Sequence, residues 1–175
     1  MNNEYFKEQE KNDWETLEAF NQQTHLFDDL TPSNKKHHSD GTGYTVNRFG
    51  EKRNFNIELK NRNQILLDNG IISGSTEKGG YTANTIMIEA HKVADLLLDN
   101  IIGLEPLYIN FLNDDTVVIF NLNKLKKRPE KSDIMNIKSK GYGKFEVAKR
   151  QFLSLNDAAI YINGKLIKRA GEDFI

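Results

Sequence analysis

One segment of the chain constrains its fold more than any other, because its side chains alternate strictly between apolar and polar. In "NFNIELK" the apolar residues Phe55, Ile57 and Leu59 fall on one face of an extended strand, and positions 54, 56, 58 and 60 fall on the other. A short turn, "FGEK", separates this strand, over 52–61, from another extended segment over 43–49. We expect the two segments to form a hairpin whose apolar face packs on the core.

The rest of the chain combines helical and strand patterns, and we find no internal repeat. Helical spacing of apolar residues predicts a helix over 3–23 and another over 86–101, the latter capped by Asn84 or Thr85. Runs of strand-forming residues and clusters of turn residues predict the remaining elements. These are strands at 106–112, 116–122 and 144–153, loops at 28–42 and 68–84, a polar basic stretch at 123–141, a short helix opening at Ser154 or Asn156, and a last strand or tail. The order predicts a mixed α/β domain.

Composition limits the chemistry and the location that we expect. The 175 residues suffice for one domain with a core, and the absence of cysteine excludes thiolate metal sites and cysteine nucleophiles. No apolar run approaches the length of a membrane span, and the acidic start of the chain lacks the order of a secretory signal, so we expect a cytoplasmic protein without a membrane partner. The net charge of −1 hides an acidic 1–30 and a basic 124–150, which either follows a nucleic-acid backbone or is a solvated loop.

The polar face of the hairpin is a candidate metal site. Glu58 and Lys60 project together, about 6.6 Å apart along the strand. With a turn centred on residues 49–51, paired residues have numbers that sum to about 100, so Lys60 lies roughly opposite Asp40. Two carboxylates are ligands that Mg²⁺ prefers, and a nearby lysine can orient or help to deprotonate an attacking water.

At these residues the sequence resembles the PD-(D/E)xK nuclease superfamily. Its motif is an Asp at the start of one strand, then a turn and a strand that ends in (Asp/Glu)-x-Lys, here "SD" at 39–40 and "IELK" at 57–60. Ser39 replaces the proline of that motif. The resemblance implies an α/β fold with a restriction-endonuclease-like core, a central mixed β-sheet flanked by helices. We expect one nuclease-like domain over 1–175, with the core at about 10–122 and a basic C-terminal extension at 123–175.

The resemblance also implies a role for each residue of the site. Asp40, Glu58 and the carbonyl of Leu59 would bind Mg²⁺, for which Mn²⁺ can substitute, and Lys60 would position the attacking water. Glu18 is the first choice, before Glu15, for an additional acid from the first helix. Lys92 or Glu89 would face the metal from the helix that follows. The implied activity is metal-dependent endonuclease cleavage of DNA, in phage or mobile-element processing, recombination or restriction, and such enzymes often act as homodimers. The residues expected to contact DNA are Arg62, Lys92, Lys126, Lys127 and Arg128.

Other interpretations of the same residues stay open. The chain can be a non-catalytic nucleic-acid-binding or protein-interaction module on the same fold, or an unrelated α/β protein whose "IELK" lies on a surface strand. His37 and His38 suggest zinc but lack further ligands at recognisable spacing. The glycine-rich "ISGSTEKGGYT" is interpreted as a flexible flap, and it lacks the lysine of a phosphate-binding P-loop. His91 is interpreted as packed or solvated, and Tyr142 as a turn residue or a stacking platform for a base.

Overall fold

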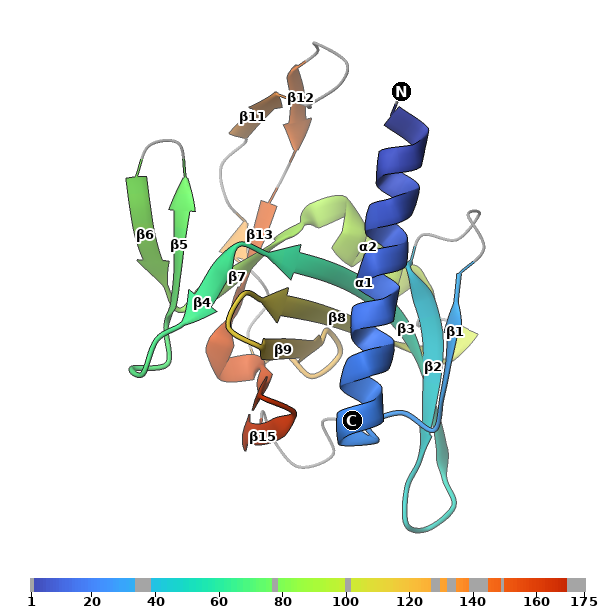
Figure 1. The fold of residues 1–175 in the computed structure, drawn as a ribbon. Coiled ribbons are helices and arrows are strands. Elements are labelled where there is room, and N and C mark those ends of the chain that lie inside the picture. Colours follow the sequence, from blue (N-terminus) through green and yellow to red (C-terminus); the bar gives the residue numbers. More distant parts are fainter. Residues whose placement is uncertain are drawn as a thin grey trace.

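A mixed sheet of seven strands forms the centre of the molecule, in the order β1-β2-β3-β8-β9-β14-β15 (Figure 1). The computed structural model describes residues 2–33, 39–76, 79–99, 102–126, 130–131, 135–138, 145–148 and 150–169. The strands of the central sheet are β1 (Asp29–Pro32), β2 (Gly41–Val46), β3 (Lys52–Arg62), β8 (Leu104–Leu112), β9 (Thr116–Asn121), β14 (Ala159–Ile162) and β15 (Lys165–Lys168). Neighbouring strands run antiparallel, except that β3 and β8 run parallel.

The parallel pair of β3 and β8 requires a crossover connection, which contains a helix and a small sheet. After β3 the chain forms the three-stranded sheet of β4 (Gln64–Leu66), β5 (Ile72–Thr76) and β6 (Gly79–Ala83). It continues through β7 (Thr85–Glu89) and α2 (Ala90–Asp99) into β8. The remaining elements are β10 (Glu130–Lys131), β11 (Met135–Lys138), β12 (Phe145–Ala148), β13 (Arg150–Ser154) and the 3₁₀ turn η2 (Leu155–Asp157).

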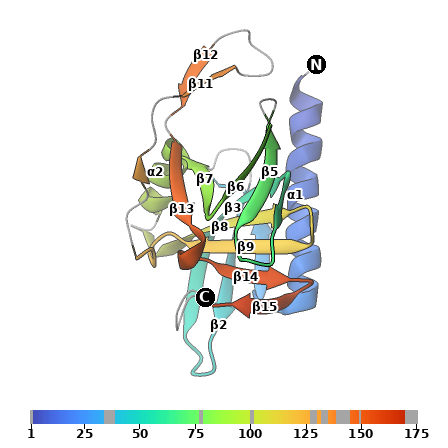
Figure 2. The same ribbon diagram turned by 90° about the vertical axis from the view of Figure 1, so that its left-hand side faces the viewer.

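Both faces of the central sheet are buried. On one face the helix α1 (Asn2–Thr24) packs through Trp14, Leu17 and Phe20. On the other face α2 contributes Val93 and Leu96, and β7 contributes buried isoleucines. Figure 2 shows the sheet between α1 on one side and α2, β7 and β13 on the other. Since the sheet is covered on both sides, every residue of β9 is buried, which accounts for its nearly continuous apolar run.

Several elements follow the sequence patterns closely. The predicted helix over 3–23 is α1, and the predicted strands over 106–112 and 116–122 are β8 and β9. The short helix expected after Ser154 is η2, whose cap is confirmed because the Ser154 side chain accepts a hydrogen bond from the Asn156 N–H. The prediction of a mixed α/β fold is confirmed, with a large mixed sheet and helices on it.

Two segments predicted as loops contain strands. Residues 28–42 include β1, which pairs with β2 and carries Pro32 at the outer edge of the sheet, where a missing N–H is tolerated. Residues 68–84 include the antiparallel hairpin of β5 and β6. Both predictions were wrong because Gly, Pro and Ser mark turns and also occur in edge strands and narrow hairpins, where few side chains need to be buried.

The helix predicted over 86–101 was wrong in its first part. Residues 85–89 form β7, which pairs with β13 so that Ile86 lies opposite Leu153 and Ile88 opposite Gln151. The β-branched residues of this segment favour a strand once such a partner is present. The helix α2 therefore begins at Ala90 rather than after Asn84 or Thr85.

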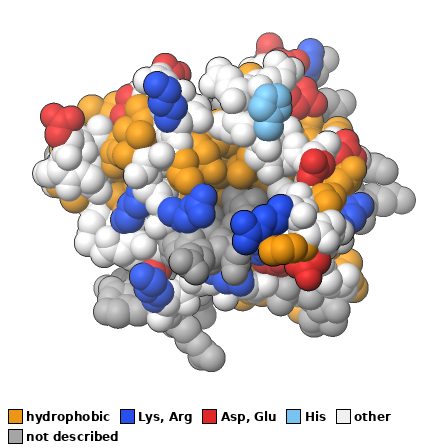
Figure 3. Space-filling view, turned by 90° about the horizontal axis from the view of Figure 1, so that it is seen from below, with side chains coloured by type: hydrophobic (Ala, Val, Ile, Leu, Met, Phe, Trp, Pro, Cys, Tyr) orange, Lys and Arg blue, Asp and Glu red, His pale blue; other side chains and the backbone are white. Residues whose placement is uncertain are grey.

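The segment after residue 122 contributes to the central sheet as well as to the small ones. β14 pairs with β9, and β15 pairs with β14. Figure 3 shows one face of the molecule, on which the lysine and arginine side chains of the described residues lie among hydrophobic and acidic ones. Within the described residues, neither helix is both long enough and apolar enough to cross a membrane.

Candidate functional site

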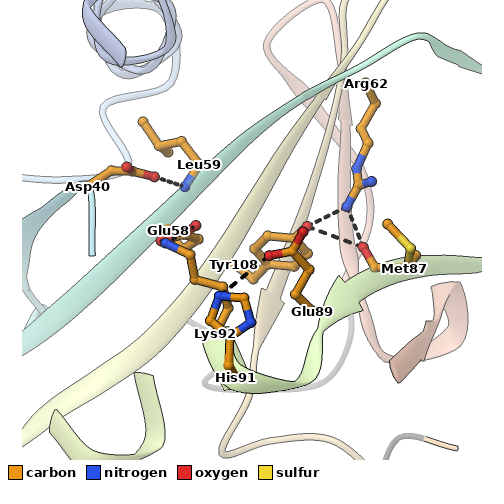
Figure 4. Close-up of polar contacts among 9 residues, drawn as sticks. All are labelled: Asp40, Glu58, Leu59, Arg62, Met87, Glu89, His91, Lys92 and Tyr108. Carbon is orange, nitrogen blue, oxygen red and sulfur yellow. Dashed lines mark hydrogen bonds and ion pairs between the residues drawn. The ribbon is translucent and has the colours of Figure 1, made fainter. Parts of the chain in front are cut away.

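Asp40 is fixed against β3 by its main chain and by its side chain. Its N–H donates to the carbonyl of Ile57 at 3.0 Å, and its Oδ2 accepts from the N–H of Leu59 at 2.6 Å. The Asp40 carboxylate thus accepts a hydrogen bond from the main chain of the residue that follows Glu58. Figure 4 shows Asp40 approaching β3 beside Glu58.

The register of the hairpin differs from the predicted one by two residues. Gly41 pairs with Ile57 and Val46 with Lys52, so the numbers of paired residues sum to 98, and the expected value of about 100 was wrong. Asp40 therefore lies opposite Glu58 and not opposite Lys60. Because side chains alternate with a period of two, a shift of two residues keeps each side chain on its predicted face. The charge of Asp40 therefore still acts on Glu58, whose pKa it raises, in spite of the error.

Glu58 is a buried carboxylate with a cationic partner. Its side chain is 8% exposed, and the Nζ of Lys92 lies 2.9 Å from Oε1 and 3.1 Å from Oε2. Burial raises the pKa of Glu58 to about 7, and the charge of Asp40 acts in the same direction, whereas Lys92 and then Lys60 oppose the rise. Close to neutral pH this group therefore exchanges between its charged and neutral forms.

Lys92 reaches Glu58 from the first turn of α2. Burial alone lowers the pKa of Lys92, but the carboxylates of Glu58, Asp40 and Glu89 outweigh it and raise that pKa above its ordinary value. Val93 and Leu96 pack in the core and set the orientation of the helix. Of the two residues considered for this position from sequence, Lys92 contacts Glu58, and Glu89 lies 3.5 Å from the exposed His91.

The other residues predicted for the site lie around this pair or away from it. Lys60 is exposed on β3, and Leu59 is buried. Glu18 accepts from the Trp14 indole at 2.9 Å and lies on α1, the helix that covers the face opposite to Glu58, so the structure does not bring it to the carboxylate pair. Glu15, the second choice, pairs on the surface of α1 with Lys11 at 3.5 Å.

The predicted DNA contacts are dispersed. Lys126 is exposed after β9, whereas Lys127 and Arg128 fall outside the described residues, as do His37, His38 and Tyr142. Arg62 is part of a network within the protein: its Nε donates to Oδ1 of Asn110 at 3.0 Å, and its Nη2 donates to the Tyr108 hydroxyl and to the carbonyl of Met87.

Sequence reasoning missed this network. Tyr108 and Asn110 are buried, and burial raises the pKa of Tyr108 to about 12, although Arg62 opposes the rise. The one indication in the sequence is that a tyrosine and an asparagine interrupt the apolar strand "PLYINFL" at alternate positions. Figure 4 shows Arg62 joining the end of β3 to β7 beside the carboxylate site.

The carboxylate pair fits a hard cation in its donor chemistry. Asp40 and Glu58 offer carboxylate oxygens, which Mg²⁺ and Mn²⁺ prefer. The Lys92 ammonium group already forms an ion pair with Glu58, so the surroundings of this carboxylate favour a positive charge. No group of three or more His, Asp or Glu residues suited to a metal occurs in the described part of the chain, and the carbonyl of Leu59 or water would have to complete such a site.

Comparison of the chain with protein-family models, with curated proteins and with solved structures finds no match.

Proposed function

We propose that the protein is a metal-dependent endonuclease that hydrolyses DNA phosphodiester bonds with the carboxylates of Asp40 and Glu58. The observation that carries the proposal is the hydrogen bond from the Leu59 N–H to Asp40, which holds the Asp40 carboxylate against β3 next to Glu58, whose pKa its charge raises. Asp40 directly precedes β2, Glu58 lies in β3, and the two are 18 residues apart in sequence.

The order of elements supports the proposal. The chain begins with the helix α1, followed by the antiparallel meander of β1, β2 and β3. The crossover helix α2 then leads to β8, which runs parallel to β3. The superfamily that the sequence resembles has a core of a helix, a three-stranded meander, a helix and another strand. In this chain β9, β14 and β15 extend the sheet beyond it.

Each side chain of the site would have a separate task. A bound Mg²⁺ supplies Lewis acidity that stabilises negative charge on the scissile phosphate. Asp40 and Glu58 would hold the cation through their oxygens. Lys60, exposed on the same strand, orients the attacking water or the phosphate by donating hydrogen bonds. A neutral Glu58 binds a cation poorly, so the raised pKa of Glu58 makes cation binding depend on pH.

The test is cleavage of supercoiled, linear and branched DNA with Mg²⁺ or Mn²⁺. We expect the wild type to cut at least one substrate, and Asp40→Ala and Lys60→Ala to lose about 100-fold or more in rate. Glu15→Ala, a change of an exposed acid on α1, serves as the control and should cut like the wild type. Undiminished activity of Asp40→Ala or Lys60→Ala would rule out this mechanism.

A second candidate function is a nucleic-acid-binding module without catalysis. The observation in its favour is that Lys92 contacts both oxygens of Glu58, so the buried charge is compensated without any metal. DNA binding by a wild type that cuts no substrate with either metal would favour this alternative.

A further inference from the structure

The ion pair of Lys92 and Glu58 lies where the proposed cation would bind. The Lys92 ammonium is nearly equidistant from the two oxygens, at 2.9 and 3.1 Å. A cation that binds a carboxylate through both oxygens takes the same position. Lys92 and a divalent metal therefore have to compete for this side of Glu58.

Lys92 is also able to leave. Its side chain is 32% exposed, against 8% for Glu58, so its path from the pair leads toward solvent. It is also attracted by Glu89, whose side chain is 40% exposed and lies at the junction of β7 and α2. A flexible four-carbon stem lets the ammonium exchange one carboxylate for another without movement of the helix.

We infer that Lys92 is a resident counterion, which neutralises Glu58 in the metal-free protein and is displaced from it when a divalent cation binds. The inference rests on the proposed function and adds a regulatory element to the same site. It explains how a buried acid next to Asp40 is tolerated without metal, since an unpaired carboxylate there would be strongly unfavourable. It also means that wild-type affinity for metal is reduced by the need to displace Lys92.

The test is Mn²⁺ binding, measured by electron paramagnetic resonance or calorimetry, without any DNA. Lys92→Met should bind Mn²⁺ about tenfold more tightly than the wild type or better, because no internal cation competes. Lys52→Met is the matched control: it removes the same charge from an exposed lysine at the start of β3, and its affinity should stay within about threefold of the wild type. Lys92→Gln repeats the test with a side chain that can still donate to Glu58, in case Lys92→Met does not fold.

The possible failures can be told apart. If Lys92→Met and Lys92→Gln bind Mn²⁺ no more tightly than the wild type, while Glu58→Gln abolishes binding, the counterion role is wrong and the metal site stands. If neither the wild type nor any variant shows saturable binding, or if adding Glu58→Gln to Lys92→Met leaves the affinity unchanged, the metal site itself is wrong and the counterion role falls with it. A gain in Lys92→Met that the double variant loses supports both.

Discussion

At the scale of single residues, Glu58 shows how its surroundings set the chemistry of the site. It stands on the polar side of an alternating strand, which in isolation would be a solvated face. The second layer of α2 and β7 covers that face, so the carboxylate is buried and its pKa rises to about 7. Since the unfolded value is near 4.5, the folded protein binds more protons than the unfolded chain between these two pH values.

Stability should therefore fall as pH rises through this interval. The contribution of Glu58 is fully present below pH 4.5 and is lost as pH rises through about 7. From pH 4.5 to about pH 8 the wild type should lose about 3 kcal/mol of unfolding free energy relative to Glu58→Gln, which has no group to titrate at this position. Urea denaturation of both proteins at the two pH values measures the difference. If the unfolding free energies of the wild type and of Glu58→Gln change by the same amount between the two pH values, Glu58 does not titrate in this range.

Arg62 is predicted to be a structural residue in addition to any contact that it makes with DNA. Arg62→Met removes the donors to Asn110, Tyr108 and the Met87 carbonyl. The Tyr108 hydroxyl still donates to the Met87 carbonyl at 3.2 Å, so the main effect is that the buried Asn110 side-chain oxygen loses its Arg62 donor. The expected loss is about 1–3 kcal/mol of unfolding free energy. Lys60→Met, at an exposed position two residues earlier, should change stability by less than about 0.5 kcal/mol. Chemical denaturation measures the unfolding free energies of both variants. If Arg62→Met is as stable as Lys60→Met, the hydrogen-bond network of Arg62 contributes little to stability.

At the scale of elements, the hairpin of β2 and β3 brings the site together, and a glycine sets how closely α1 approaches it. A Cβ at Gly41 would lie 2.3 Å from the Trp14 ring and 2.7 Å from the Thr31 carbonyl oxygen. Both distances are far shorter than a normal van der Waals contact. The oxygen belongs to the backbone of β1, so it cannot move away as the end of a flexible side chain could. The glycine therefore allows β1, β2 and α1 to meet next to Asp40.

Gly41→Ala should destabilise the protein by about 1–3 kcal/mol through this overpacking. Gly80→Ala is the matched control, because the nearest atom to its Cβ would be 3.7 Å away. Thermal and urea unfolding of the two variants test the prediction. A Gly41→Ala variant as stable as Gly80→Ala would mean that α1 and β1 move apart at little cost.

The elements also show how far the sequence can predict such a site. Alternation in β3 and the turn before it predicted the neighbourhood of Asp40 and Glu58, because facing depends only on a local period of two. The partner of Glu58 could not be assigned in the same way. Lys92 lies in the first turn of α2, which begins at Ala90 directly after β7, and β7 is a strand that pairs with β13, far along the chain. Non-local pairing of this kind leaves no local pattern.

At the scale of the whole molecule, the C-terminal strands complete the sheet that holds the site. β14 lies against β9 and places Ala159 and Tyr161 in the core under α1 and Ile160 in the core on the other face. β13 covers β7, and β7 leads into α2 and Lys92. The sequence patterns after residue 122 are too short and too basic to predict this integration.

A chain that ends at Lys126 should therefore not fold cooperatively, because β9 and β7 would each lose a neighbouring strand. Circular dichroism and urea denaturation would show a broad transition or none. Ile167→Ser, a change on the exposed edge strand β15, should leave the transition of the full chain sharp. A sharp transition in the truncated protein would mean that β13 and β14 are dispensable.

The most direct test of the central claim, that Asp40 and Glu58 act as one cleavage site, is a double-mutant cycle on the rate of DNA cleavage with Mg²⁺. Asp40→Asn, Glu58→Gln and the double variant are compared with the wild type under single-turnover conditions. If the two carboxylates hold one cation, each single change should lower the rate by about 100-fold or more, and the double change should lower it little further. Losses that multiply in the double variant, or cleavage that persists in either single variant, would contradict the account.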